Sequence, residues 1–244
     1  MQPVDEPKVT SQLIAERHAR LLDRLRAAAT ATNRDPDAFR IVAITKAHPV
    51  ATLRSAWEAG LHCFGENRVQ EAEAKLAALP EAEWHFVGRL QSNKARRAVS
   101  LFETIHSVDT LDMLRRIERI SHDDGKHPRL LLQVNLTGET QQGGVDPAWL
   151  EDQSAAGSEL ARELGNLRDA VPAGLMTIGR YGASHDAARA TFARLRELRD
   201  RLAVASGREL PELSMGMTAD AEAAVAEGAT LVRIGTAIFG PRPA

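Results

Sequence analysis

The sequence has very little of several features that would restrict where a protein works. Cys63 is the only cysteine among 244 residues, so the chain cannot form an internal disulfide, which is typical of a reducing compartment. No run approaches the roughly 20 apolar residues that span a bilayer, and the N-terminus lacks an apolar signal segment. We therefore expect a cytoplasmic protein that does not enter a membrane.

Excess charge of one sign is also missing. The 31 basic residues are balanced by 33 acidic ones, and a formal net charge of -2 offers no attraction for nucleic acid or anionic membranes. Stretches rich in Ser, Gly or Pro that would mark a linker are absent as well. With 43% hydrophobic residues, a chain of this length can bury a large core, and we predict one domain over residues 1–244.

Short apolar runs alternate with amphipathic helical segments along the chain. After a first helix over about residues 9–31, eight strands are predicted: Arg40–Thr45, Leu61–Gly65, Glu83–Gly88, Thr104–Val108, Arg129–Asn135, Ala173–Ile178, Glu212–Met215 and Leu231–Ile234. The helices between them are Val50–Ala59, Arg68–Leu79, Gln91–Val99, Thr110–Ser121, Pro147–Leu164, His185–Ser206 and Ala219–Glu227. Because the loops are short and no Gly-rich first turn occurs, we predict a closed (β/α)8 TIM barrel over about residues 40–240, with a doubly wound open sheet as the alternative.

Polar residues follow most of the predicted strands, at the end where barrels carry their binding sites. Lys46 follows the first strand, where a lysine can be a phosphate ligand, a general base, a Schiff-base amine or a solvated strand end. After the eighth strand, Gly235 and Thr236 begin a short turn whose backbone can approach an anion closely. The Ser214–Thr218 loop adds hydroxyl groups after the seventh strand. Together these features predict a phosphorylated ligand with a carbonyl group near Lys46.

Segments between residues 41 and 240 resemble the pyridoxal 5'-phosphate (PLP) homeostasis proteins, which are similar to the barrel domain of bacterial alanine racemase. The matching segments are Ile41–Lys46 with Pro49, Phe64–Glu71, Trp84–Lys94, Ser107–Asp109, Leu132–Asn135, Gly174–Met176, Leu213–Met217 and Val232–Gly240.

The resemblance implies a fold-type III PLP protein in which Lys46 holds PLP as a covalent aldimine. Arg233 would face the pyridine nitrogen and, because arginine keeps its proton, would leave that nitrogen unprotonated and the ring a weaker electron sink. Asn67 would lie near the ring hydroxyl. The phosphate group would be held mainly by Thr218, Gly235 and Thr236. Ser214 and Met217 would complete the set of cofactor-binding residues.

The sequence departs from the family pattern at two lysines. His48 replaces a lysine that often follows the PLP lysine, and Gln142 replaces one in the loop after the fifth strand. Any transfer or secondary docking role of those lysines is therefore in doubt. The Thr137–Gly144 loop itself is interpreted as either a mobile lid or a plain flexible connection.

Racemisation needs two acid/base groups, one on each face of the substrate. Racemases take the second from a tyrosine of an extra C-terminal domain, which this sequence, ending at Ala244, does not contain; Tyr181 is its only tyrosine and is interpreted as a loop residue packed on the rim. We therefore predict no catalytic residue, and a monomeric PLP carrier that buffers PLP or supplies it to apo PLP-dependent enzymes. The alternatives are a PLP-dependent amino-acid racemase and a Schiff-base aldolase that uses Lys46 on a sugar phosphate.

Two histidines and one glutamate have side chains that can bind a metal or form an ion pair. His85 and His106 project from neighbouring predicted strands but have no evident third ligand, so we interpret them as core or rim histidines and predict no metal site. Glu66 is expected to orient Asn67 or to pair with Lys46.

Overall fold

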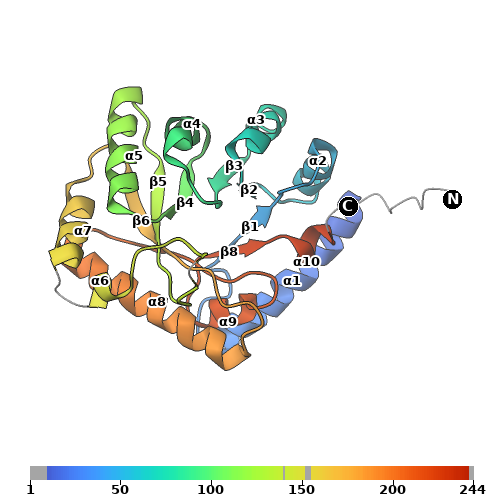
Figure 1. The fold of residues 1–244 in the computed structure, drawn as a ribbon. Coiled ribbons are helices and arrows are strands. Elements are labelled where there is room, and N and C mark those ends of the chain that lie inside the picture. The colour runs from blue at the N-terminus through green and yellow to red at the C-terminus, as the bar shows by residue number, and fades with distance from the viewer. Residues whose placement is uncertain (1–9, 140, 152–154, 242–244) are drawn as a thin grey trace.

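The fold is a closed barrel of eight parallel strands. The structure is a computed structural model, and it describes residues 10–139, 141–151 and 155–241. Neighbouring strands pair in sequence order and β8 pairs with β1, as Figure 1 shows. The strands are β1 (Arg40–Ile44), β2 (Cys63–Glu66), β3 (Glu83–Phe86), β4 (Thr104–Val108), β5 (Arg129–Gln133), β6 (Val171–Met176), β7 (Glu212–Ser214) and β8 (Leu231–Ile234). Each lies within two residues of its predicted bounds, and the TIM barrel is confirmed.

Helices surround the barrel. They are α1 (Ser11–Ala31), α2 (Val50–Glu58), α3 (Val69–Ala78), α4 (Ala95–Leu101), α5 (Leu111–Asp124), α6 (Ala148–Glu151), α7 (Ala155–Asn166), α8 (His185–Ser206), α9 (Ala221–Ala226) and α10 (Thr236–Phe239), with a 3-10 turn η1 (Ser92–Lys94) before α4. In this described part of the chain no helix is both long and apolar enough to cross a membrane.

The N-terminal helix completes the outer layer. The helix that follows β8, α10, has only four residues, and α1 packs against α2, α9 and α10 where a full eighth helix would lie (Figure 1). Its N-cap is Thr10, whose hydroxyl accepts a hydrogen bond from the N–H of Leu13. The predicted start at residue 9 lies outside the described residues.

Within the predicted helix Pro147–Leu164 the structure describes α6 and α7, and residues 152–154 between them are outside the described part. The predicted helix Ala219–Glu227 starts later than expected. Ser214 ends β7, and Gly216 in the loop after it has a φ of 87°, which is not helical. The next helix, α9, begins only at Ala221.

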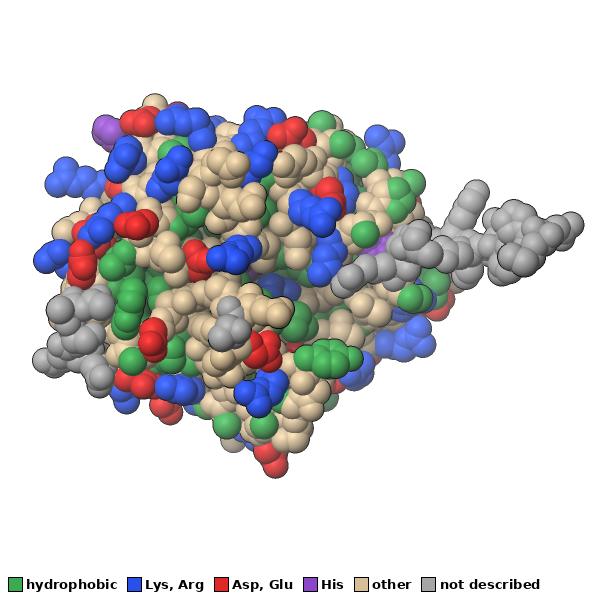
Figure 2. Space-filling view, in the orientation of Figure 1, with side chains coloured by type: hydrophobic (Ala, Val, Ile, Leu, Met, Phe, Trp, Pro, Cys, Tyr) green, Lys and Arg blue, Asp and Glu red, His purple; other side chains and the backbone are tan. Residues whose placement is uncertain are grey.

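The interior of the barrel is charged at the N-terminal ends of the strands. Arg40 of β1 pairs with Glu83 of β3 at 2.7 Å, and Arg129 of β5 pairs with Glu212 of β7 at 2.6 Å. These four side chains come from the odd strands, as one layer of a barrel interior does. On the outer surface, charges of both signs are interspersed, as Figure 2 shows for one face, in keeping with the small net charge.

Candidate functional site

Lys46 lies in a tight turn at the C-terminal end of β1. The N–H of His48 donates to the carbonyl of Thr45 at 3.0 Å, and Ala47 between them has a φ of 64°. This is a β-turn in which the left-handed position is occupied by alanine, at a cost of about 1–2 kcal/mol. The turn leaves Lys46 half-buried at the rim of the barrel.

A buried ionic group holds this turn from outside the barrel. Lys75 of α3 donates from Nζ to the carbonyl of Thr45 at 2.7 Å and pairs with Glu66, which also accepts a hydrogen bond from the Thr45 hydroxyl. All three residues are buried, and Glu66 Oε2 has no partner among the described residues. Glu66 was expected to pair with Lys46 or to orient Asn67, so Lys75 is a residue that the sequence analysis missed.

Asn67 follows β2 at the same end of the barrel and is half-buried. The backbone of Gly88, after β3, lies directly against it: a Cβ at position 88 would be 2.0 Å from the carbonyl oxygen of Asn67. Gly88 is therefore required for this close approach of the two loops, which fixes where Asn67 lies.

Arg233 is buried inside the barrel near the end of β8, with 6% of its surface exposed. Its Nη1 donates to Ser214 Oγ at 2.7 Å, and its Nη2 donates to the carbonyl of Thr177 at 2.8 Å. Burial lowers the pKa of Arg233 to about 10, while the charge of Asp220 acts in the opposite direction. The guanidinium thus stays charged at neutral pH and has further N–H groups besides the two used here.

Ser214 lies inside the barrel and not in the loop above it. Its side chain is fully buried, and its hydroxyl contacts Arg233 and His106. Ser214 is predicted as a cofactor-binding residue, and the structure places it as the last residue of β7 with its side chain turned into the barrel. In this structure Ser214 supports Arg233.

The loop after β7 is closed by Asp220. The N–H of Met217 donates to Asp220 Oδ1 at 2.6 Å, so this backbone donor is already used. At Gly216, besides the positive φ, a Cβ would lie 2.5 Å from that of Ala224, which leaves room only for glycine. Thr218 follows in the same loop and is half-buried.

Gly235 begins the turn after β8. The N–H groups of Thr236 and Ala237 stand at the first positions of α10, where a helix has no acceptor for them. A Cβ on Gly235 would lie 3.5 Å from the carbonyl oxygen of Ile44, so this turn lies beside the end of β1. The structure therefore brings the backbone donors of the Gly235 turn next to the Lys46 turn.

The chain is similar in sequence to proteins of one family. A family model described as the N-terminal domain of alanine racemase matches residues 18–243. A pyridoxal phosphate homeostasis protein of Pseudomonas aeruginosa is 45% identical over 233 residues, which cover 94% of this chain and 96% of that protein. The chain belongs to the pyridoxal phosphate homeostasis protein family.

Solved structures share the fold. PipY of Synechococcus elongatus, in a structure with PLP bound, is 41% identical with a TM-score of 0.81, covering 93% of this chain and 100% of that one. Alanine racemase of Bartonella henselae matches with a TM-score of 0.72 at 14% identity, over 96% of this chain and 60% of the racemase chain. The racemase match shows a shared barrel.

The two departures from the family pattern have different surroundings. His48 is buried, and its ring packs on that of Phe239 in α10 at 4.9 Å, so it joins the Lys46 turn to the Gly235 turn. Gln142 instead belongs to the loop after β5, where its side chain donates to Glu139 Oε2 at 2.7 Å. The Asn135 side chain donates to the carbonyls of residues 139 and 142 in the same loop, and Thr140 lies outside the described residues.

The remaining predicted residues, Tyr181, His85 and His106, differ in their exposure to solvent. Tyr181 is 99% exposed, so its ring does not pack on the rim as expected. His85 and His106 are both fully buried, as core histidines. Ligand atoms of Cys63, Glu83 and His85 lie within 4.8 Å of one another, a grouping not foreseen; burial raises the pKa of the Cys63 thiol, which disfavours the thiolate that binds metals.

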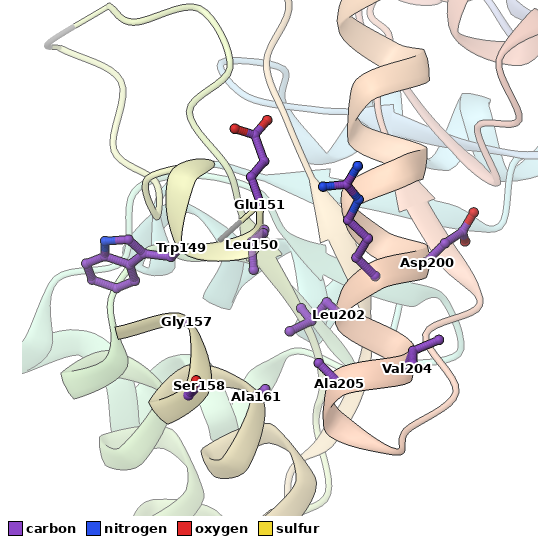
Figure 3. Close-up of a pocket in the computed structure, with 11 residues that line it drawn as sticks. Trp149, Leu150, Glu151, Gly157, Ser158, Ala161, Asp200, Leu202, Val204 and Ala205 are labelled. Atoms are coloured by element: carbon purple, nitrogen blue, oxygen red, sulfur yellow. The ribbon is translucent and has the colours of Figure 1, made fainter. Parts of the chain in front are cut away.

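A separate pocket lies on the outside of the barrel. Figure 3 shows it between α6, α7 and α8, with an apolar lining that includes Trp149, Leu150, Ala161, Leu202 and Val204. None of the described residues that line it was predicted to bind a cofactor.

Proposed function

We propose that this protein binds PLP at the C-terminal end of the barrel and serves in PLP homeostasis as a carrier, without a dedicated reaction. The observation that carries the proposal is the contact between the Lys46 turn and the Gly235 turn, through Ile44 and through the His48–Phe239 ring pair. The turn that carries the Lys46 amine therefore lies beside the backbone N–H groups at the start of α10. PLP combines an aldehyde with a phosphate, and this donor set fits both.

Each residue has a distinct part in the proposed site. Lys46 would supply the amine that holds the aldehyde carbon, and the N–H groups of Thr236 and Ala237, with the Thr218 hydroxyl, would hold the phosphate. Arg233 would donate to the pyridine nitrogen with an N–H group that Ser214 and the Thr177 carbonyl do not use. Bound in this way, the cofactor supplies an aldehyde that condenses with a primary amine with loss of water.

One observation supports a carrier over a racemase. Tyr181, with 99% of its surface exposed, is not held by packing as a second acid/base group would be. The recipients of the cofactor would be apo PLP-dependent enzymes, and the cytoplasmic location and monomeric state stay predictions.

The test is to map where PLP attaches. The protein is incubated with PLP, reduced with borohydride and digested, and the modified peptide is identified by mass spectrometry. We expect a pyridoxyl group on Lys46 in the wild type and in Lys94→Ala, a control lysine at the same end of the barrel, and its loss from that peptide in Lys46→Ala. An unmodified Lys46 peptide in the wild type would refute the proposal.

A second assay addresses catalysis. Both enantiomers of several amino acids are incubated with the PLP-loaded protein, and we expect no racemisation above that of free PLP. Turnover that falls in Tyr181→Phe would favour the racemase instead.

A further inference from the structure

A chain of hydrogen bonds crosses the inside of the barrel from its N-terminal end to Arg233. Glu83 Oε1 lies 2.8 Å from His85 Nε2, and His85 Nδ1 lies 2.8 Å from His106 Nε2. On the other side, His106 Nδ1 lies 2.8 Å from Ser214 Oγ, which accepts from Arg233 Nη1 at 2.7 Å. The chain runs from β3 and β4 across the interior to β7 and β8. It joins the ion pairs at one end of the barrel to the proposed cofactor site at the other.

Donor and acceptor chemistry gives this chain one direction when both imidazoles are neutral. Glu83 can only accept, so His85 must carry its proton on Nε2, and its bare Nδ1 then accepts from His106 Nε2–H. The bare Nδ1 of His106 in turn accepts the proton of the Ser214 hydroxyl. The reverse direction would set an unprotonated His85 Nε2 against the Glu83 carboxylate. With the direction fixed, the Ser214 oxygen has no proton left to donate and serves Arg233 as an acceptor.

Burial and the surrounding charges keep His106 neutral. Burial first, then the neighbouring His85 and the positive charges of Arg233, Arg129 and Arg40, hold the pKa of His106 well below its usual value, so its ring is neutral at pH 7. Glu83 stays ionised, because the hydrogen bond from His85 lowers its pKa to about 2. A cation at one end and an anion at the other polarise the neutral groups between them in the same direction.

We propose that His106 and His85 are positioning residues for the cofactor ring. His106 accepts the hydrogen bond of the Ser214 hydroxyl, His85 fixes the direction of that bond, and the Ser214 oxygen thereby stays an acceptor that holds Arg233 in place. This inference rests on the proposed function, since Arg233 must lie at the pyridine nitrogen for its position to matter. It assigns a binding role to two core histidines on the far side of the barrel interior from β8.

The first test uses the wild-type protein without cofactor. Nitrogen-15 NMR of the wild-type protein labelled on histidine reports the protonated nitrogen of each ring. At pH 7 we expect both His85 and His106 to be neutral with the proton on Nε2. A proton on Nδ1 of either ring, or a doubly protonated His85, would reverse the chain and refute the proposal, whether or not PLP binds.

The second test compares two substitutions of similar size at one position. His106→Leu removes the acceptor for the Ser214 proton, whereas the amide oxygen of His106→Asn can occupy the place of Nδ1. After loading with PLP, we expect roughly tenfold faster loss of cofactor to a trapping apo-enzyme in His106→Leu, the effect of about one hydrogen bond to a charged group. We expect His106→Asn to restore most of the difference.

Thr104 provides the matched control. It lies two residues before His106 on β4, and its buried hydroxyl has no partner in the described part of the chain. Thr104→Val should therefore lose cofactor at the wild-type rate. If wild type carries PLP on Lys46 but His106→Leu also releases it at the wild-type rate, the positioning role fails and the proposed function stands. If His106→Leu does not fold, Ser214→Ala, which removes the same acceptor from Arg233, is expected to show the same faster release.

Discussion

Replacing Lys75 by methionine is expected to destabilise the protein more than any surface change on the same helix. The Lys75 side chain is 8% exposed and that of its partner Glu66 is 0% exposed. Removal of the ammonium would leave the Glu66 carboxylate buried with a hydrogen bond from the Thr45 hydroxyl, while its second oxygen has no partner among the described residues. The carbonyl of Thr45 would also lose its bond from Nζ.

The magnitude follows from the cost of an unpaired buried charge. Breaking a buried ion pair at one partner costs about 3–5 kcal/mol of unfolding free energy, whereas replacing both partners by apolar side chains is often neutral or stabilising. We therefore expect about 3–5 kcal/mol for Lys75→Met and recovery of most of this loss in Lys75→Met with Glu66→Met. Because Thr45 precedes Lys46, the single variant should also react more slowly with PLP.

Urea unfolding of the single and double variants measures these free energies. Glu73→Gln on the same helix is the control, because Glu73 pairs with Arg97 at 2.7 Å but both side chains are about half exposed. An exposed pair contributes about 0–1 kcal/mol, so this variant should stay close to wild type. A loss below about 1 kcal/mol for Lys75→Met, or no recovery in the double variant, would show that the buried pair does not hold the Lys46 turn.

Three further predictions follow from single contacts. Gly88→Ala should cost about 1–3 kcal/mol in urea unfolding, since its Cβ would lie 2.0 Å from the Asn67 carbonyl oxygen; a wild-type midpoint would contradict this. His48→Ala should weaken binding of inorganic phosphate, measured by calorimetry, because it loses the ring contact with Phe239 that joins the two turns, and unchanged affinity would disprove the link. The pKa of Glu83 is lowered from 4.5 to about 2, chiefly by the hydrogen bond from a histidine, so its contribution to stability is present above pH 4.5 and is lost as the pH falls towards 2. The unfolding free energy of Glu83→Gln should therefore depend less steeply on pH in that range than that of wild type, and equal slopes would refute the assignment.

The sequence predicted the barrel well because its strands are short apolar runs separated by clear helices. The start of β6 is predicted at Ala173, yet the strand begins at Val171 and Pro172 pairs with Leu130. Proline is accepted near the first position of a strand, where its missing N–H is not needed. The predicted boundary is therefore two residues late.

The residues around the site were harder to predict, for two physical reasons. Ser214 ends a strand of only three residues, too short for alternation to show which way its side chain points. Lys75 lies on a helix where lysine normally faces water, and its burial depends on Glu66, which is on another element. In both cases the deciding contact is made across elements, and a single sequence does not contain it.

The two ends of the proposed cofactor ring are held by separate networks. The Lys46 turn is held from outside the barrel by Lys75 and Glu66, which bind Thr45, and Arg233 is held from inside by Ser214 and the histidines behind it. These networks share no described residue, so substitutions in one should not alter the effect of substitutions in the other. A variant that combines Lys75→Met with His106→Leu should release PLP with the product of the two single effects. A smaller combined effect would mean that one rigid body sets both ends of the site.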